Sequence, residues 1–592
     1  MIETLSQLLL HTVKFYPKDD LMLYKKEGSY VSISTEEFGS MVKDFSLGLK
    51  DLGFEAGNKL IIFSETRPEW VTSDMACQCS GGVTVPIYPT LTSEQVKYII
   101  DNSDARFVVC SNKELWQKIE AVKSELGKVE SFISFETVAH DDVLSFDQLL
   151  ERGKKISKEK PELFEEMAMS VKPEDLASII YTSGTTGIPK GVMLTHSNFI
   201  SNIRTCLALV EITEQETSLS WCPLSHIMER IVTYGYLYKG STIGYAESLE
   251  ALLENLGEVR PHFMVLPPRI YERIYSGVID NVLSYSSLKR KIFYWALEVG
   301  KKYGQKKILA QPISQSLKLR RKLAHKLVFS KIIAKTGGRI RFFMSGGAPL
   351  SKDIAEFFYA LGIVILEAYG LTETSPVISL NTFENLKFGT VGKPIPGVEV
   401  RIAEDGEILT KGPHVMKGYY RKEAETKEAI KGGWFHTGDI GHLDKEGFLV
   451  ITDRKKDIIV TSGGKNVAPQ QIENLLKINP NISNAVVIGD KRKFISAFII
   501  PNLEKLEKYA KANNISYMDK SDLVEKEEIV DFMLAEVDRS TPNLARFEKV
   551  KRIALLDRDF ELGDVEVTPT LKVKRNIIEE KYKNLIDSLY ED

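Results

Sequence analysis

A loop rich in glycine and hydroxyl side chains places the tightest constraint on this chain. It reads Tyr-Thr-Ser-Gly-Thr-Thr-Gly-Ile-Pro-Lys-Gly-Val-Met-Leu-Thr-His over residues 181–196. The apolar residues 176–180 before it predict a buried strand, and the apolar spacing over residues 200–210 after it predicts a helix. A strand, a glycine-rich turn and a helix together make a common frame for binding phosphate.

The residue types in this loop suit phosphate oxygens. Its glycines free the backbone to curl, its hydroxyl groups add hydrogen-bond donors, and Lys190 adds a fixed positive charge. The loop is not a Walker A motif, because Lys190 stands between Pro189 and Gly191 and no Gly-Lys-Ser/Thr occurs. The predicted phosphate-binding residues are Thr182, Ser183, Gly184, Thr185, Thr186, Gly187 and Lys190.

Size and composition exclude several classes of protein. The chain of 592 residues is too long for one small domain, and its 43% of hydrophobic residues are ample for a large core. The 78 basic and 81 acidic residues nearly cancel, so no overall charge favours nucleic acid. The five cysteines lack disulfide or metal spacing, the N-terminus lacks a basic signal, and no apolar window is long enough to span a membrane. These features predict a cytoplasmic enzyme.

The first part of the chain alternates between strand-like and helical patterns. Strands are expected at 59–64, 82–87 and 105–110, with helices at 68–79 and 93–102 between them. A second alternating block has expected strands at 241–245, 262–266 and 339–344. Such alternation predicts an α/β fold with parallel sheets. The charged residues 154–172 are expected to form a surface loop.

The pattern changes near residue 455. Strands are expected at 457–461, 485–488, 495–500 and 550–555, and helices at 469–478, 503–512 and 576–590. This pattern predicts a small α+β domain at the C-terminal end. The charged run 453–457 suits an exposed hinge. We therefore predict a large domain over 1–453 and a small one over 454–592.

One segment is strongly basic. Residues 289–341 hold sixteen lysines and arginines and a single acid, Glu298, with Phe293, Trp295, Leu317 and Phe329 among them. Helices with solvated basic faces would explain this composition. A surface that attracts anionic lipid or the phosphates of coenzyme A would explain it as well.

Two short motifs follow expected strands and can be interpreted in two ways. Gly346 and Gly347, in Ser-Gly-Gly-Ala-Pro-Leu, allow a flat ring to approach the backbone, or they form an ordinary turn before a helix capped by Ser351. In residues 367–374, Tyr369 can stack on adenine, and Thr372 and Glu373 can reach a phosphate and its Mg²⁺. Alternatively, Glu373 caps a helix or forms a surface pair.

Two later motifs are ambiguous in the same way. Asp439 lies in the glycine-bracketed turn 432–441 and can accept hydrogen bonds from both ribose hydroxyls, with Arg454 fifteen residues further on. Asp439 can equally serve as a turn residue. Lys572, near the C-terminal end, can enter a distant active site from a loop, although most lysines are simply solvated.

Taken in order, these motifs resemble those of the AMP-forming acyl and aryl ligases, a family that includes acyl-CoA synthetases, luciferases and the adenylation domains of peptide synthetases. The run 433–469, the motif Pro-Leu-Ser-His-Ile-Met-Glu-Arg at 223–230 and the long basic insertion resemble the long-chain fatty acyl-CoA synthetases in particular. Leu571 precedes the terminal lysine where the family often has glycine, as in many long-chain members.

The resemblance implies a large N-terminal domain of layered α/β subdomains with a small mobile α+β C-terminal domain. It implies that Lys572 bridges the carboxylate and the α-phosphate, and that Lys456 is the hinge. Thr182 and Glu373 resemble the Mg²⁺ ligands, and Asp439 and Arg454 the ribose ligands. Further ATP- or AMP-binding positions are Gly346, Gly347, Ala348, Tyr369, Gly370 and Thr372; those for coenzyme A are Gly463, Gly464 and Lys465.

The implied activity is that of a long-chain fatty acid–CoA ligase. ATP and a fatty acid give an acyl-adenylate, which coenzyme A then converts to acyl-CoA. His226 is expected to orient the carboxylate or face the thiol, unless it is a hydrogen-bonded core residue. A nucleophilic pair of Cys222 with His226 is conceivable, but this chemistry does not require one.

Several points remain open from the sequence. Arg230 stands where some bacterial long-chain enzymes have an aromatic gate, so the gating of the fatty-acid tunnel is not predicted. An acyl-AMP ligase or an aryl-CoA ligase would use the same scaffold. A nucleotide-binding protein without catalysis is disfavoured by the complete set of charged motifs. Oligomeric state, peripheral membrane contact and chain length are left open.

Overall fold

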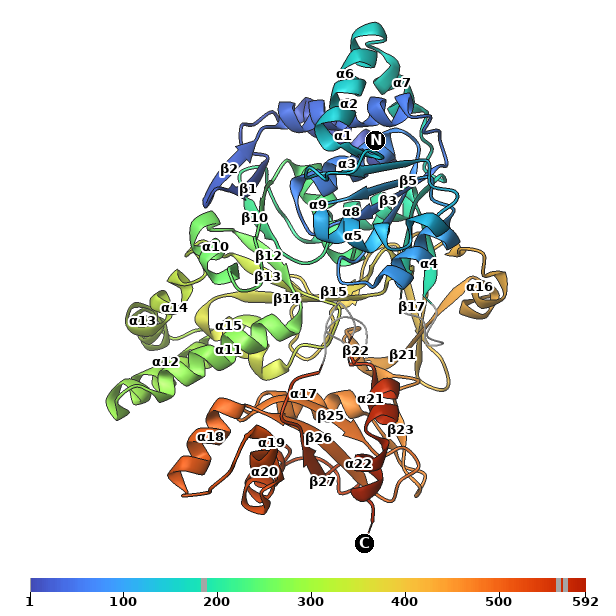
Figure 1. Ribbon diagram of the computed structural model, residues 1–592. Helices are drawn as coiled ribbons and strands as arrows, with labels where there is room; N and C mark the ends of the chain where they lie inside the picture. Colours follow the sequence, from blue (N-terminus) through green and yellow to red (C-terminus); the bar gives the residue numbers. More distant parts are fainter. Residues whose placement is uncertain (1, 183–188, 561–565, 568–572, 592) are drawn as a thin grey trace.

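The computed structural model of the protein describes residues 2–182, 189–560, 566–567 and 573–591. Figure 1 shows a large body built from the N-terminal three quarters of the chain, with a smaller domain below it. The fold is therefore of the mixed α/β type that the alternating pattern predicts.

An eight-stranded sheet carries the first alternating block. Its central strands β3 (Lys59–Phe63), β4 (Val83–Ile87) and β5 (Phe107–Cys110) are parallel, and α3 (Pro68–Cys79) and α4 (Ser93–Ser103) connect them. These bounds agree with the sequence prediction to within two residues. Next to β4 lies β8 (Leu176–Thr182), which pairs in antiparallel fashion with β9 (Lys190–Thr195). The phosphate-loop motif therefore joins two strands, and α8 (His196–Leu209) begins only after the second.

A nine-stranded sheet carries the second block. Its strands β10 (Thr217–Ser220), β11 (Thr242–Tyr245), β12 (Phe263–Leu266), β13 (Phe342–Ser345) and β14 (Val364–Gly370) are parallel. Helices α8 and α9 (Ile227–Lys239) lie between the two sheets (Figure 1). One apolar cluster joins both sheets through these helices and includes Ile62, Ile180, Phe199, Leu237, Ile243 and Phe263.

A smaller antiparallel sheet leads towards the C-terminal domain. It contains β17 (Glu399–Ile402), β18 (Glu407–Lys411), β20 (Ile430–Lys431), β21 (Trp434–Leu443) and β22 (Leu449–Arg454). In the pairing of β21 with β22, Asp439 lies opposite Arg454. The two residues that the sequence assigned to ribose are thus neighbours on adjacent strands.

The predicted surface loop at 154–172 is wrong. Most of the segment lies in two helices, α6 (Phe146–Glu159) and α7 (Leu163–Ser170). The apolar side of α6, with Leu149 and Ile156, packs into the core beside α2 (Thr35–Asp51), while the lysines face solvent. A side chain at Gly153 would collide with the backbone oxygen of Asp44, so glycine permits this close helix contact.

The C-terminal domain has a three-stranded sheet with a core on each face. Its strands are β25 (Ile482–Ile488), β26 (Ile495–Pro501) and β27 (Val550–Leu555). Alternate residues point to opposite sides, so Val487 and Ile499 join one apolar cluster while Val486 and Phe498 join the other. Helices α17 (Pro469–Lys477), α18 (Leu503–Ala512) and α20 (Glu527–Ser540) belong to the first side.

Four further short elements of this domain differ in part from the sequence prediction. On the second side of the sheet, the expected helix at 576–590 is divided at Tyr582 into α21 (Arg575–Lys581) and α22 (Lys583–Ser588). The strand expected at 457–461 is reduced to β23 (Ile459–Val460), which pairs with β24 (Asn466–Val467).

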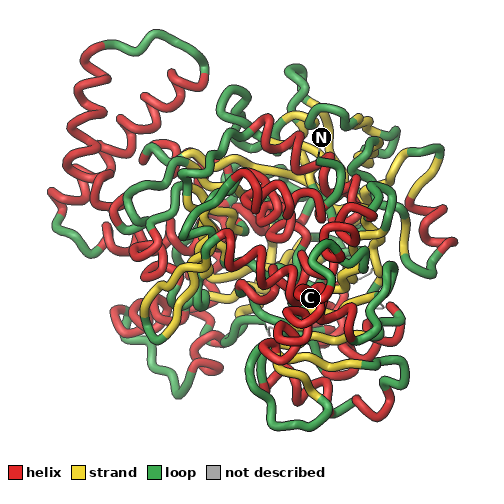
Figure 2. The backbone as a smooth tube through the Cα atoms, turned by 90° about the horizontal axis from the view of Figure 1, so that it is seen from above, coloured by secondary structure: helices red, strands yellow, loops and turns green. Residues whose placement is uncertain are grey.

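The basic segment is a helical unit at the edge of the large body. It comprises α12 (Ser287–Ile308), α13 (Gln315–Ala324), a π-helical turn at His325–Phe329 and α14 (Ser330–Ala334), and it follows α11 (Pro268–Leu283). These helices form the left edge of the body in Figure 1, and helices stand out on the same side in Figure 2. Within the described residues, no helix is both long and apolar enough to cross a membrane.

Candidate active site

A cavity of about 1980 Å³ lies where the edges of the sheets meet the C-terminal domain. It collects residues from motifs that are spread over almost four hundred positions of the sequence. The predicted site residues that line it are Thr182, Lys190, His226, Gly346, Gly347, Ala348, Tyr369, Gly370, Thr372, Glu373, Asp439, Arg454 and the predicted hinge residue Lys456.

Some predicted residues cannot be placed in this cavity. Ser183, Gly184, Thr185, Thr186, Gly187 and Lys572 fall outside the described residues. Their described neighbours Thr182 and Pro189 on one side, and Val573 and Lys574 on the other, do line the cavity. Gly463, Gly464 and Lys465 lie between β23 and β24 and are not among the described residues that line it.

The turn after β13 opens onto the cavity. Gly347 has a φ of +82°, a left-handed conformation that favours glycine, and no atom lies within 4 Å of where a side chain would begin. Ser351 precedes α15 (Lys352–Leu361), but its hydroxyl makes no capping hydrogen bond. The turn thus leaves backbone exposed on the cavity side, as contact with a flat ring would require.

Tyr369, Asp439 and Arg454 form a connected group. The hydroxyl of Tyr369 donates to Asp439 Oδ2 at 2.7 Å, and Arg454 Nε lies 3.4 Å from Asp439 Oδ1. Tyr369 is only 9% exposed, and burial raises its pKa well above the usual value. Tyr369 therefore acts as a neutral hydrogen-bond donor that orients the carboxylate of Asp439.

Glu373 lies in the cavity rather than in a surface pair. Its Oε1 accepts a hydrogen bond from the hydroxyl of Tyr419 at 3.0 Å, a partner that the sequence did not indicate. Burial raises the pKa of Glu373 because desolvation penalises its charged form. A nearby cation would stabilise the charged form of a carboxylate in such a position.

His226 caps helix α9 and also faces the cavity. Its Nδ1 accepts a hydrogen bond from the backbone N–H of Met228 at 3.2 Å. Cys222 is different, because its thiol is buried and directed at the carbonyl oxygen of Val265, 3.9 Å away. Burial raises the pKa of the Cys222 thiol well above its usual value, which keeps it protonated. The geometry gives no support to a Cys–His nucleophile.

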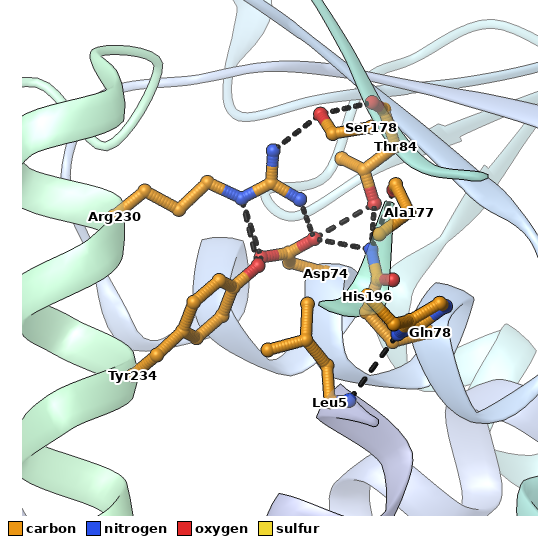
Figure 3. A network of polar contacts seen from close by, with 9 residues as sticks. All are labelled: Leu5, Asp74, Gln78, Thr84, Ala177, Ser178, His196, Arg230 and Tyr234. Carbon is orange, nitrogen blue, oxygen red and sulfur yellow. Dashed lines mark hydrogen bonds and ion pairs between the residues drawn. The ribbon is translucent and has the colours of Figure 1, made fainter. Parts of the chain in front are cut away.

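Arg230 does not line the cavity at all. It is wholly buried behind it, with its Nη2 2.6 Å from Asp74 Oδ1 and its Nη1 donating to Ser178 Oγ at 2.6 Å (Figure 3). Tyr234 donates to the same carboxylate. The network ties α3, α9 and β8 together, and β8 runs directly into the phosphate-loop motif. Arg230 therefore stabilises the packing of α3, α9 and β8. It does so at the position where some bacterial long-chain enzymes have an aromatic gate.

The expected exposed hinge at 453–457 is only partly correct. Asp453 is 2% exposed, and its Oδ2 accepts a hydrogen bond from the backbone N–H of Gln470, at the start of α17. Burial raises the pKa of Asp453 to about 6. Burial also lowers the pKa of Lys456. The docking of α17 against the end of β22 explains why these charged residues are not all in solvent.

The five cysteines are all free thiols. Among the described residues, no group of three or more His, Cys, Asp or Glu side chains is arranged to hold a metal ion. Any metal in this cavity would therefore need ligands from a hydroxyl group or from a bound substrate as well as from a carboxylate.

Comparison with known proteins agrees with the site. A family model described as AMP-binding enzyme matches residues 9–420, and one for the C-terminal domain of AMP-binding enzymes matches residues 456–592. The long-chain-fatty-acid–CoA ligase FadD15 of Mycobacterium tuberculosis is 36% identical over 578 residues, covering 96% of this chain and 94% of the relative. The peroxisomal long chain acyl-CoA synthetase 6 of Arabidopsis thaliana is 32% identical, with coverage of 95% and 82%.

Solved structures share the fold at lower identity. The anthranilate CoA ligase AuaEII in complex with anthranoyl-AMP aligns with a TM-score of 0.75 and 17% identity, over 99% of this chain and 98% of that one. The adenylation domain of a carboxylate reductase from Mycobacterium chelonae aligns with a TM-score of 0.76 and 19% identity, over 100% and 91%. The chain belongs to the family of AMP-binding enzymes.

Proposed function

We propose that this protein is a long-chain fatty acid–CoA ligase. It would convert ATP, a fatty acid and coenzyme A into acyl-CoA, AMP and diphosphate through an acyl-adenylate. The observation that carries the proposal is the cavity, which gathers a glycine turn with exposed backbone, a Tyr–Asp–Arg group, a half-buried glutamate and a lysine within one space.

The nucleotide would be held by three of these features. The backbone of Gly346, Gly347 and Ala348 would take the adenine, with Tyr369 and Gly370 beside it. Asp439, oriented by Tyr369 and Arg454, has a carboxylate that can accept hydrogen bonds from the two ribose hydroxyls. Thr182, Thr372 and Lys190 would contact the phosphates, together with the loop at 183–187.

Mg²⁺ is part of the proposal. The donor set fits a hard cation, because Thr182 and Glu373 both offer oxygen atoms in the cavity and the burial of Glu373 favours a positive neighbour. Thr182 and Glu373 would hold the ion. When bound, it supplies positive charge to the phosphate groups.

The residues of this chain would catalyse the first step by placing positive charges around the α-phosphate of ATP. The fatty-acid carboxylate attacks the α-phosphorus and diphosphate leaves, so negative charge accumulates between two anions. Lys190 and Lys572 would offset that charge, and His226 would orient the carboxylate. In the second step the thiol of coenzyme A attacks the carbonyl carbon of the adenylate and AMP leaves. No enzyme nucleophile is needed.

We infer that the two steps use different arrangements of two domains, divided between residues 453 and 454. Lys572 would act in the first step. In the second, the C-terminal domain would turn at Lys456 and present Gly463, Gly464 and Lys465 to coenzyme A. The support is that each domain has apolar clusters of its own, and that residues 573–577 and Glu579 line the cavity while 463–465 do not.

AMP release tests the proposed activity. With purified protein, palmitate, ATP and Mg²⁺, we expect sustained AMP release only when coenzyme A is present, with loss of free thiol in equal amount. Equal turnover without coenzyme A would identify an acyl-AMP ligase instead. Faster turnover with an aromatic acid than with palmitate would identify an aryl-CoA ligase.

Peripheral contact with a membrane is a second proposal. It is carried by the basic helices at 287–334, which present lysines and apolar side chains on the surface. Long-chain fatty acids partition into bilayers, so a ligase that meets them there would gain access to its substrate. Co-sedimentation with vesicles tests this contact.

A further inference from the structure

Tyr419 is a residue of the cavity wall that the sequence motifs did not single out. It belongs to β19 (Gly418–Tyr419), a short strand that pairs in antiparallel fashion with β9. The backbone N–H of Tyr420 donates to the carbonyl oxygen of Gly191 at 2.7 Å. Because β9 begins at Lys190, directly after the phosphate-loop motif, this pairing holds Tyr419 next to that motif.

The backbone around Tyr419 is also tied to the motif that contains Glu373. The N–H of Met416 donates to the carbonyl oxygen of Glu373 at 2.8 Å. The N–H of Tyr419 itself donates to Thr426 Oγ1 at 2.9 Å. The segment 416–420 therefore joins two motifs that lie far apart in the sequence, and these backbone contacts fix the place of Tyr419 between them.

The side chain of Tyr419 meets one charged group with its hydroxyl and another with its ring. The hydroxyl donates to Glu373 Oε1 at 3.0 Å, and the ammonium of Lys190 lies 5.3 Å from the centre of the ring. An aromatic face attracts a cation at this distance. Burial and the negative charge of Glu373 raise the pKa of Tyr419, so its hydroxyl keeps its proton and remains a donor.

Two opposite charges in one cavity would be expected to pair with each other. Lys190 and Glu373 both line the cavity, yet these two described residues form no ion pair, and each contacts Tyr419. A direct pair would neutralise the ammonium and the carboxylate together. Tyr419 instead offers each charge a partner that is itself neutral.

We propose that Tyr419 is a positioning residue that keeps Lys190 and Glu373 apart, so that Lys190 meets the phosphates of ATP and Glu373 meets Mg²⁺. Its ring holds the ammonium, and its hydroxyl fixes the orientation of the carboxylate. Neither contact cancels a charge, so both charges act on the nucleotide. The inference deepens the proposed function and rests on it for the roles of Lys190 and Glu373.

ATP binding without turnover tests this role. The full-length protein is titrated with ATP in a calorimeter, without fatty acid or coenzyme A, first in EDTA and then at a series of Mg²⁺ concentrations. A parent protein that binds ATP but releases no AMP with palmitate and coenzyme A would contradict the proposed function, while the test of Tyr419 would still be decided by binding. A parent protein that binds no ATP would overturn both.

Two substitutions separate the hydroxyl from the ring. Tyr419→Phe keeps the ring, so ATP binding in EDTA should match the parent, whereas the Mg²⁺ concentration that gives half of the gain in affinity should rise roughly fivefold. Tyr419→Leu loses both contacts, so Lys190 should pair with Glu373 and ATP binding in EDTA should weaken roughly tenfold. Tyr420→Phe is the matched control and should bind like the parent, because the hydroxyl of Tyr420 lies 3.4 Å from Asp104 Oδ2 and Tyr420 is not among the described residues that line the cavity.

A second background shows whether the loss in Tyr419→Leu comes from pairing of the two charges. With Glu373→Gln already present, Lys190 no longer has that carboxylate as a partner, and Tyr419→Leu should weaken ATP binding in EDTA by less than about threefold. A purely structural role predicts the same loss in both backgrounds, so equal losses would overturn the proposal. An unchanged or lowered Mg²⁺ requirement in Tyr419→Phe would overturn it as well, and this conservative variant decides alone if Tyr419→Leu does not fold.

Discussion

Replacing Arg230 with methionine tests whether the network behind the cavity braces the scaffold. Arg230 and Asp74 are both fully buried, with 2.6 Å between their closest charged atoms. Methionine keeps much of the arginine volume but carries no charge. The variant would therefore leave the carboxylate of Asp74 in the core without its ionic partner.

The structure sets the expected size of the effect. Removing one member of a buried ion pair costs about 3–5 kcal/mol. Asp74 would keep hydrogen bonds from Thr84 at 2.7 Å and Gln78 at 3.2 Å, and one from Tyr234. Because these donors remain, we expect the free energy of unfolding to fall by about 3 kcal/mol, the lower end of that range. For a unit of roughly 450 residues with an unfolding entropy of about 2.1 cal/mol/K per residue, the melting temperature should fall by roughly 3 °C.

Calorimetry on the full-length protein would measure the melting temperatures of the parent, of Arg230→Met and of a matched control. Arg152→Met is the matched control, because Arg152 pairs with Asp51 at 2.8 Å on the surface, where such a pair is worth at most about 1 kcal/mol. Adding Asp74→Asn to Arg230→Met should recover part of the loss, since no charge then remains buried. If Arg230→Met melts within about 1 °C of the control variant, the buried network does not stabilise the fold by the expected amount.

Four further variants give separate tests of the site and of the core beside it. Glu373→Gln should raise the Mg²⁺ concentration needed for half-maximal AMP release while the melting temperature stays unchanged; equal Mg²⁺ dependence in variant and parent would remove Glu373 from metal binding. Lys572→Ala should slow adenylate formation about a hundredfold or more and spare thioester formation from supplied acyl-AMP, whereas Lys456→Pro should do the reverse. Equal slowing of both half-reactions by Lys572→Ala would contradict this division. Burial raises the pKa of Glu229 to about 8, above its value of 4.5 in the unfolded chain, so stability should fall as pH rises between these values. Glu229→Gln should flatten that decline in melting temperature, and an unchanged slope would show that Glu229 does not cause it.

Strong local patterns made much of the fold predictable. Helices α3 and α18 and strand β27 have the predicted bounds, because an apolar pattern with clear end signals fixes each of them. Helix α6 was missed because its charged residues outnumber its apolar ones. Helix α7 has only two charged residues, and it was missed because its eight residues make a short pattern inside a charged segment. What decides their structure is the packing of a few apolar side chains, such as Leu149, into the core beside α2, which a local pattern does not contain.

The motifs predicted which residues would meet, but not how they are supported. Thr182, Glu373 and Asp439 line one cavity as expected. The pairing of Arg230 with Asp74 spans 156 positions and could not be seen from local spacing. One signal was present, since Asp74 is the single charged residue between Glu69 and Glu94. A lone charge in so apolar a stretch indicates a buried partner elsewhere in the chain.

The contacts between the two domains indicate how firmly this arrangement is held. Arg269 pairs with Asp559 at 2.9 Å, and Lys505 pairs with Asp280, which joins α11 to the C-terminal domain. All four side chains keep part of their exposure, so each pair contributes at most about 1 kcal/mol and is weakened by salt. If the proposed roles of Lys572 and of residues 463–465 hold, the observed arrangement serves adenylate formation, because the described neighbours of Lys572 line the cavity. Turning the domain towards coenzyme A once diphosphate has left would break these two weak ion pairs and also the hydrogen bond from the backbone N–H of Gln470 to the buried carboxylate of Asp453.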